Sequence, residues 1–225
     1  MADNNYYKQQ LNSQRLFQAY DTNIARVRAY LAAEIAFVRD SLSGTERMLE
    51  LGAGYGRIIK QLAGSCQSIV GIDIAPESVL LAQEYLRDQV NARVIEMDVH
   101  SLALDQKFDV VLCLQNGLSA MQVTSKDTLE RILDVTESGG RIYFSTYSEK
   151  FWEHRLMWFQ EQAEKGLLGE LDMEQTRDGV IVCKDGFRAV THSPEDLSRV
   201  GNLSGCRYEL REVDESILFL IIHKR

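Results

Sequence analysis

A short apolar segment runs directly into a cluster of glycines between Met48 and Arg57, where the chain reads Met-Leu-Glu-Leu-Gly-Ala-Gly-Tyr-Gly-Arg. Glycines let the backbone turn sharply and approach a ligand closely, because no Cβ intervenes. The helical pattern that follows places unpaired N–H groups just behind the turn. This strand, turn and helix predict an α/β fold with a ligand site where the strand ends.

The rest of the central region alternates strands with helices. Continuous apolar runs such as Phe-Asp-Val-Val-Leu-Cys-Leu at 108–114 are typical of strands buried on both faces. The expected strands are 47–51, 68–73, 93–97, 108–114 and 141–146, and the expected helices are 57–63, 77–89 and 124–136. This alternation predicts a parallel sheet with right-handed crossovers.

The flanks depart from this alternation. Residues 6–42 have apolar side chains at helical spacing, and 149–165 form an aromatic-rich helical pattern. Short strands are expected at 171–176, 180–184 and 187–191, separated by two Asp-Gly turns, and Ser193-Pro194 opens a helix. The last segments, 207–213 and 216–223, form a closing hairpin.

We therefore predict one domain over 1–225, with a seven-stranded, mostly parallel, Rossmann-like sheet and a C-terminal antiparallel hairpin. Its expected parts are an N-terminal helical cap (1–43), a cofactor-binding core (44–147), a lid or acceptor insertion after the fifth strand (148–192), and a closing helix and hairpin (193–225).

The spacing around the glycines discriminates between nucleotide ligands. The turn reads G-x-G-x-G, and Arg57 stands where the dinucleotide fingerprint G-x-G-x-x-G needs its third glycine. Glu50, two residues before the turn, suits a cationic amino group better than a pyrophosphate. Asp73 closes the second strand about 20 residues on, where a carboxylate can bind both ribose hydroxyls. This last feature is shared with enzymes that bind NAD.

These features resemble the three cofactor motifs of class I S-adenosylmethionine-dependent methyltransferases: Glu50 to Gly56, Asp73, and Met97-Asp98-Val99. The resemblance covers about residues 45–147 and the final hairpin. It implies a role for each of the following residues. The backbone around Glu50, Gly52, Ala53 and Gly54 would hold the methionine end of S-adenosylmethionine, Asp73 the ribose, Ile74 one face of adenine, and Asp98 and Val99 the adenine edge, with Gln115 and Asn116 near the sulfonium and the acceptor.

The sequence also limits the acceptor. Gln115-Asn116-Gly117 follows the fourth strand in place of the Asn/Asp-Pro-Pro-aromatic motif of enzymes that modify bases or glutamine, and the Asp-Asn pair of the metal-dependent catechol type is missing. We expect a metal-free enzyme acting on a small molecule, whose accepting atom (N, O, S or C) stays undetermined.

Candidates for catalysis come from the fifth strand and the insertion. His154 is the first choice for a general base, and Tyr147 for an orienting hydroxyl, while His100 and His192 are alternatives. Aromatic side chains of the insertion either line an acceptor pocket or anchor the insertion to the core, and tyrosines of the N-terminal segment could contact the cofactor.

Composition excludes several classes of protein. The formal net charge is −8, from 25 Lys and Arg against 33 Asp and Glu, and no basic cluster suits nucleic acid. The four cysteines form no CxxC pair, no signal-like segment begins the chain, and no apolar run could span a bilayer. We expect a cytoplasmic protein with no metal, nucleic-acid or membrane partner; a homodimer is left open.

Two rivals remain. A non-catalytic module that binds S-adenosylmethionine or its product, and acts through a partner, would keep the cofactor residues but block the acceptor pocket. An NAD-dependent oxidoreductase would share Asp73, although the glycine spacing and the closing hairpin oppose it.

Overall fold

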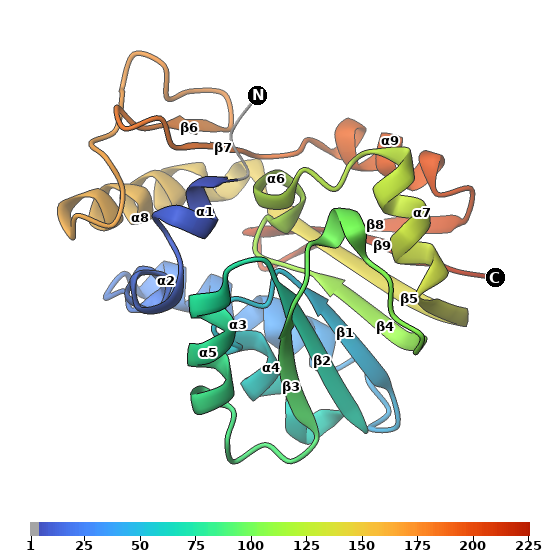
Figure 1. The fold of residues 1–225 in the computed structure, drawn as a ribbon. Coiled ribbons are helices and arrows are strands. Elements are labelled where there is room, and N and C mark those ends of the chain that lie inside the picture. The colour runs from blue at the N-terminus through green and yellow to red at the C-terminus, as the bar shows by residue number, and fades with distance from the viewer. Residues whose placement is uncertain (1–4) are drawn as a thin grey trace.

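The computed structural model describes residues 5–225; residues 1–4, which are part of the segment expected to lack a signal, lie outside the described residues. A seven-stranded sheet runs through the molecule in the order β3-β2-β1-β4-β5-β9-β8 (Figure 1). Its strands are β1 (Arg47–Leu51), β2 (Ser68–Asp73), β3 (Ala92–Glu96), β4 (Phe108–Cys113), β5 (Thr136–Tyr147), β8 (Arg207–Val213) and β9 (Ile217–His223).

The first five strands are parallel and the last two are antiparallel. The predicted mostly parallel sheet with its closing hairpin is therefore confirmed. From β1 the chain passes to β2 on one side and later returns to β4 on the other side. Ligands of open α/β sheets bind at such a switch point, outside the carboxyl ends of the strands.

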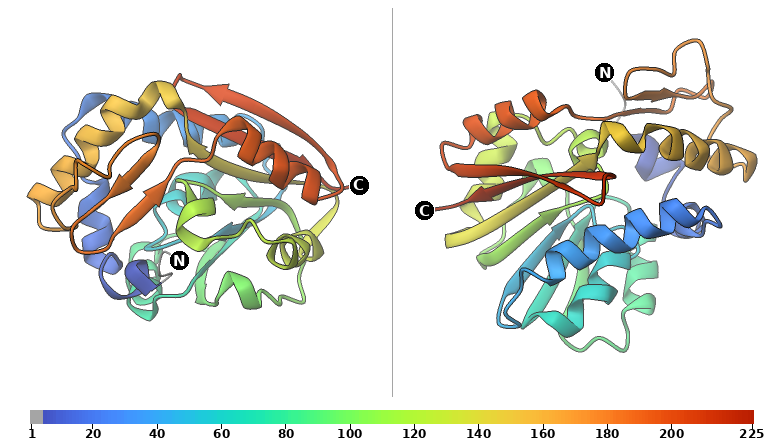
Figure 2. Two further views of the ribbon diagram at one scale, coloured as in Figure 1. Left: turned by 90° about the horizontal axis from the view of Figure 1, so that it is seen from above. Right: turned by 180° about the vertical axis from the view of Figure 1, so that it is seen from behind.

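Helices cover both faces of the sheet, as the views in Figure 2 show. One face carries α3 (Ala25–Arg39), α4 (Arg57–Leu62) and α5 (Pro76–Tyr85), and the other carries α7 (Lys126–Asp134) and α9 (Pro194–Leu203). Because side chains alternate along a strand, Met48 and Val110 point into the first core, whereas Leu49 and Val111 point into the second. All four are fully buried, which explains why these strands are continuous apolar runs.

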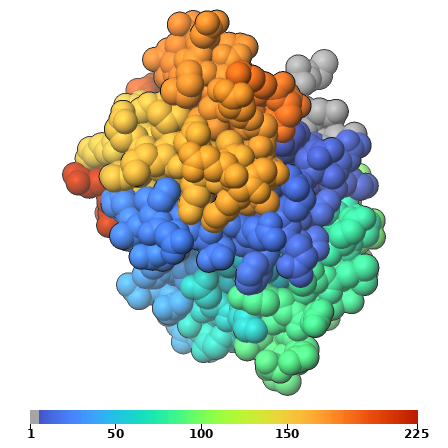
Figure 3. All heavy atoms as spheres, turned by 90° about the vertical axis from the view of Figure 1, so that its left-hand side faces the viewer, coloured from blue at the N-terminus to red at the C-terminus, as the bar shows by residue number. Residues whose placement is uncertain are grey.

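The N-terminal helices and the segment after β5 pack against each other above the carboxyl ends of the strands, and we call the two together the roof. It consists of α1 (Asn5–Gln9), α2 (Ser13–Tyr20), α8 (Trp152–Glu164) and a separate two-stranded sheet of β6 (Val180–Val182) and β7 (Arg188–Val190). Figure 3 shows both segments meeting along a continuous surface. The Trp158 indole N–H donates to the Ala19 carbonyl at 3.0 Å, and the Tyr6 hydroxyl donates to Asp185 at 2.6 Å.

Two sequence-based expectations need correction. The helical stretch expected over 6–42 is three helices, because Ser13 adopts φ +47 and the chain is extended again at Ile24. The strand expected over 171–176 is reduced to a single bridge, Leu171 to Cys183. There the Asp172 carboxylate accepts the Glu174 and Gln175 amides and so favours a turn over a strand.

Short elements complete the chain. An additional helix, α6 (Gly117–Met121), follows β4 where the sequence suggested at most a turn. Three-residue 3₁₀ turns are η1 (Ala63–Ser65), η2 (Val99–Ser101) and η3 (Glu149–Phe151). Among the described residues, no helix is both long and apolar enough to cross a membrane.

Candidate functional site

A cavity lies between the carboxyl ends of the parallel strands and the roof. Seven of the predicted site residues line it: Gly52, Asp73, Ile74, Asp98, Val99, Gln115 and Tyr147. The cavity thus joins the ends of β1, β2, β3, β4 and β5. The remaining wall comes from the roof, mainly from α1, α2, α8 and Phe187.

The glycine turn forms the floor of the cavity at the end of β1. Gly52, Gly54 and Gly56 all have positive φ, at +68, +54 and +84. The Ala53 amide donates to the Ile72 carbonyl at 2.9 Å and so holds the turn against β2. A Cβ on Gly52 would lie 2.8 Å from the Met121 sulfur. Ala53 and Gly54 do not themselves line the cavity; they shape the backbone beneath it.

Asp73 ends β2 and presents its carboxylate to the cavity. Its two oxygens accept the Gly54 amide at 2.8 Å and the Ala75 amide at 2.9 Å. Burial raises the pKa of Asp73, and the two amides act against this rise. A carboxylate has about four lone-pair sites, so Asp73 can still accept two further hydrogen bonds.

Asp98 also lines the cavity, but one of its oxygens has a local role. Its Oδ1 accepts the His100 amide at 2.9 Å and caps η2. The His100 ring lies between the Thr128 hydroxyl and the Met121 carbonyl, each at 2.9 Å. Both ring nitrogens of His100 are therefore engaged in packing α6 and α7. The second oxygen of Asp98 and the Val99 amide take no part in these contacts, so they can face a ligand.

Gln115 is positioned by a buried acid that the sequence analysis did not single out. Glu34 of α3 is fully buried, and its Oε1 accepts the Gln115 amide at 3.0 Å and the Ser145 hydroxyl at 2.6 Å. Its Oε2 accepts the Gln115 side-chain amide. This pairing orients the carboxamide and leaves the Gln115 Oε1 buried without a partner.

Glu50 and Arg57 lie close to the cavity without lining it. Burial raises the pKa of Glu50 well above its ordinary range, against the opposing effect of the Arg57 charge. Glu50 Oε2 and Arg57 Nη2 are both buried and lack hydrogen-bond partners in the structure. The Arg57 guanidinium lies 4.4 Å from the ring centroid of Tyr20, which does line the cavity. An orphaned acceptor and an orphaned donor thus flank the glycine turn.

The two candidates for catalysis are placed differently. Tyr147 lines the cavity at the end of β5, with its ring 5.4 Å from that of Tyr30. His154 is half-buried beside Phe151 and outside the cavity lining, and its Nδ1 has no partner. Burial lowers the pKa of His192, which also lies outside the lining. A catalytic role for any of these residues stays a prediction.

Asn116 serves as a connector between elements in the structure. It adopts φ +59, and its side-chain amide donates to the Val190 carbonyl of β7 at 3.0 Å. Its Oδ1 accepts the Thr146 hydroxyl of β5 at 2.8 Å. Asn116 thus joins the end of β4 to β5 and to the roof, and it does not line the cavity.

Residues of the roof that the sequence analysis did not name also reach the site. Trp158, Phe159 and Phe187 of the insertion and Tyr7 and Tyr20 of the N-terminal segment line the cavity. Lys8, Leu11 and Gln162 line it too, although no sequence signal singled them out. Glu34 could have been found, because it is a charged residue within the apolar stripe of α3. Among the described residues, no three His, Cys, Asp or Glu side chains gather as a metal site.

Comparison with known proteins adds to this geometry. Residues 48–140 match the family model described as "Methyltransferase domain". A curated relative, the ubiquinone biosynthesis O-methyltransferase of Hydrogenovibrio crunogenus, is 24% identical over 115 residues, which are 50% of this chain and 47% of that protein. The chain therefore spans about half the length of the curated relative it matches.

Solved structures match over almost the whole chain. The PH0226 protein from Pyrococcus horikoshii has a TM-score of 0.65 at 18% identity, covering 98% of both chains. The N-methyltransferase NodS from Bradyrhizobium japonicum, in complex with S-adenosyl-L-homocysteine, has 0.62 at 14%, covering 99% of both. The magnesium protoporphyrin IX methyltransferase from Synechocystis, with bound S-adenosylhomocysteine, has 0.65 at 17%, covering 99% of this chain and 100% of the other. These likenesses concern the fold.

Proposed function

We propose that this chain, which has the class I S-adenosylmethionine-dependent methyltransferase fold and a methyltransferase domain at residues 48–140, transfers a methyl group from S-adenosylmethionine to a small-molecule acceptor. The observation that carries the proposal is the cavity that joins Gly52, Asp73 and Asp98 at the switch point of the sheet. Its other wall is aromatic, which suits a small organic acceptor.

The orphaned polar atoms of the site fit the amino-acid end of the cofactor. An α-amino group needs hydrogen-bond acceptors and an α-carboxylate needs donors. Glu50 Oε2 and Gln115 Oε1 are buried acceptors without partners, and Arg57 Nη2 is a buried donor without one. Leaving such groups unpaired costs about 1–3 kcal/mol each, so a zwitterionic ligand nearby would relieve that cost.

The nucleoside end is matched by the ends of β2 and β3. Asp73 would accept the two ribose hydroxyls with the lone pairs that the Gly54 and Ala75 amides leave free. Ile74 would lie against the adenine face, and the free oxygen of Asp98 would accept the adenine amino group. The Val99 amide would face the adjacent ring nitrogen.

When bound, the cofactor supplies a methyl group on a positively charged sulfur, and the electrons of the broken carbon–sulfur bond return to that sulfur. The chain must align the acceptor with that bond and exclude water. Gln115 and Tyr147 line the cavity where β4 and β5 end, and the roof closes it from above. Tyr147 would orient the acceptor through its hydroxyl. His154 lies outside the lining, so a general base, where the acceptor needs one, stays a prediction.

The proposal includes no metal ion, because the chain lacks the Asp-Asn pair of the metal-dependent catechol enzymes at the sequence level. It also places the enzyme in the cytoplasm. It excludes nucleic acid as acceptor, and the net charge of −8 supports this second point. A methylation rate that is unchanged by a chelator such as EDTA would support the first of these points.

The test is calorimetric titration of the purified protein with S-adenosylhomocysteine, S-adenosylmethionine and NAD in parallel. We expect saturable binding of the first two and none of NAD. Binding of NAD alone would refute the proposal in favour of an oxidoreductase. Binding of the first two, without turnover of any amine, acid or phenol in an acceptor screen, would favour the non-catalytic module.

A further inference from the structure

The charges around the cavity are divided between its two ends. Among the residues that the structure describes, the two acidic residues of the lining, Asp73 and Asp98, lie at the strand ends that would hold the nucleoside. The aromatic part of the lining, which we call the acceptor end, consists of Tyr7, Tyr147, Trp158, Phe159 and Phe187. Within residues 5–225, no carboxylate belongs to this aromatic part, and Lys8 is the one basic residue of the lining.

A second cation lies directly behind the acceptor end. Arg155 of α8 is 0% exposed, yet no carboxylate within residues 5–225 forms an ion pair with it. Its guanidinium donates to the Gly179 carbonyl at 2.8 Å and to the Thr191 hydroxyl at 2.6 Å, while its Nε has no partner. A buried charge without a counter-ion is costly and rare.

Two aromatic rings of the cavity lining lie against this guanidinium. The Arg155 Cζ lies 4.5 Å from the ring centroid of Tyr147 and 5.4 Å from that of Phe159, and both rings line the cavity. Burial raises the pKa of the Tyr147 hydroxyl, so this neighbour stays neutral and does not compensate the charge. In a low-dielectric environment, a charge acts over several ångströms.

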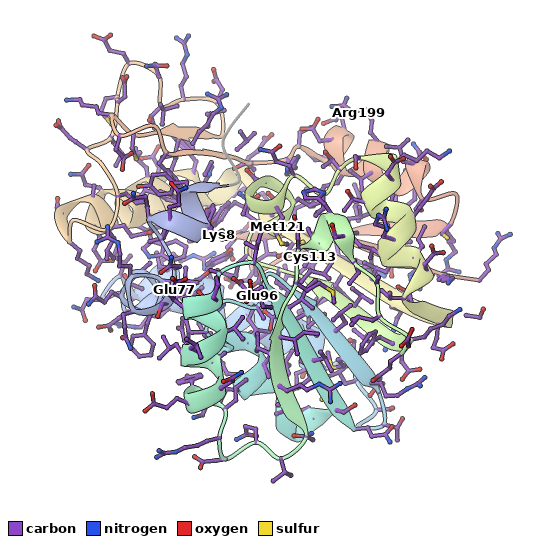
Figure 4. The ribbon with its side chains drawn as sticks, in the orientation of Figure 1. Lys8, Glu77, Glu96, Cys113, Met121 and Arg199 are labelled. Atoms are coloured by element: carbon purple, nitrogen blue, oxygen red, sulfur yellow. The ribbon has the colours of Figure 1, made fainter. Side chains whose placement is uncertain are left out.

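Lys8 supplies a further positive charge at the cavity. It lies in the last turn of α1, lines the cavity and is exposed, and it forms no ion pair with any described carboxylate. Figure 4 labels Lys8 beside α1. The cavity is therefore flanked by one buried and one exposed cation.

We propose that the methyl acceptor is an organic anion, with an aromatic or apolar body and a carboxylate or another anionic oxygen group. This inference rests on the proposed function. The body would pack on the aromatic walls, and the anionic group would compensate Arg155 and pair with Lys8. An amine in the same aromatic walls is disfavoured, since Arg155 already stacks on two of these rings and would repel it.

Arg155 also has a structural contribution, because its hydrogen bonds to Gly179, Ala189 and Thr191 tie α8 to the β6–β7 segment. Neutral donors could make such bonds without burying a charge, so the structural role accounts for the contacts but not for the charge. The experiment must therefore measure ligand charge preference and not stability alone.

The test uses three probes that share one ring and differ in charge: benzoate, benzamide and benzylamine. Each is titrated calorimetrically into the protein saturated with S-adenosylhomocysteine. We expect benzoate to bind about tenfold more tightly than benzylamine, with benzamide between them, and the difference to shrink as salt is added. Equal binding of benzoate and benzamide, tighter binding of benzylamine, or no binding of benzoate to the loaded protein would overturn the inference.

Variants assign the preference to its residues. Lys8→Gln, on the exposed rim, should weaken benzoate about threefold while S-adenosylhomocysteine binding is kept, and unchanged benzoate binding would count against Lys8. Arg155→Lys should retain the benzoate preference and Arg155→Met should lose it. If the Arg155 variants fail to fold, the ranking in the wild-type protein and the Lys8 variant still decide. Failure of S-adenosylhomocysteine itself to bind would refute the proposed function instead.

Discussion

Replacing Asp73 by asparagine changes one oxygen of the cavity floor and little else. In the structure both carboxylate oxygens accept backbone amides, from Gly54 and Ala75, and their remaining lone pairs face the cavity. Asparagine keeps one acceptor oxygen and turns the other into a donor group. The remaining carbonyl oxygen still accepts its backbone amide and can accept a hydrogen bond from only one ribose hydroxyl. The other ribose hydroxyl therefore loses its acceptor.

The size of the effect follows from these bonds. A hydrogen bond to a charged group contributes about 1.5–3 kcal/mol and a neutral one about 0.5–1.5 kcal/mol. Asp73→Asn would lose one charged bond to the ribose and convert the other to a neutral one, which together cost about 3 kcal/mol. Binding of S-adenosylhomocysteine should therefore weaken roughly 150-fold. Stability should change little, because relief of the buried charge offsets the amide left unpaired.

Calorimetric titration with S-adenosylhomocysteine measures this loss, and Glu96→Gln is its matched control. Glu96 pairs in register with Asp73 on the neighbouring strand β3, but it is exposed and does not line the cavity. The Glu96→Gln substitution removes the same unit of charge from the same carboxyl-end edge of the sheet, and Figure 4 labels Glu96. An Asp73→Asn protein that binds within threefold of wild type, or a Glu96→Gln protein that weakens equally, would refute the assignment of Asp73 to the ribose.

Three further outcomes are expected. Gly52→Ala should cost about 1–2 kcal/mol of unfolding free energy through its positive φ and should also weaken S-adenosylhomocysteine binding. The control Gly44→Ala, at a glycine with φ +93 and open space around it, should cost a similar amount of stability and leave binding unchanged. Equal losses of binding in the two variants would contradict this. Because burial raises the pKa of Asp73, its ionised form costs stability in the folded protein, and this cost appears as pH rises through that pKa. The ribose hydroxyls of the cofactor favour the ionised form, so the affinity for S-adenosylhomocysteine should fall, as pH is lowered, at a higher pH than for an ordinary aspartate. Calorimetric titrations over a pH series measure this, and an affinity that does not change with pH would contradict it. Asn116→Ala removes the donor to Val190 and an acceptor from the core, so urea unfolding should show a loss of about 1–3 kcal/mol, and a loss below about 0.5 kcal/mol would mean that this connector is dispensable.

The core of the fold could be predicted from the sequence because local signals and burial agree there. The glycine turn, the buried run at 108–114 and the Asp-Gly hairpin turns each determine a local geometry that the sheet then uses. The N-terminal region was harder, since the apolar spacing continues across Asn12 and Ser13, where an extended residue followed by a φ of +47 interrupts the helix. Helix α6 was missed because five residues beginning with glycine give no periodicity to read.

The site divides in the same way. Gly52, Asp73 and Asp98 follow directly from strand ends, so the sequence could place them at one edge of the sheet. Arg155 could not be assigned, and Glu34 could be noticed only as a charge within an apolar stripe, because the partners of both are 24 or more residues away in the chain and only tertiary packing brings them together. His154 illustrates the limit most plainly: residue type suggested a base, whereas the rotation of α8 decides what faces the cavity.

The roof described above has an optical consequence. The chain contains two tryptophans, Trp152 and Trp158, and both belong to α8. Trp158 donates to Ala19 of α2 and lines the cavity, while the Trp152 ring lies 5.8 Å from the Arg155 guanidinium. Intrinsic tryptophan emission therefore arises entirely from the part of the molecule that covers the site. Without any label, the protein carries its own fluorescent reporter of whether the N-terminal helices and α8 stay together when a ligand enters.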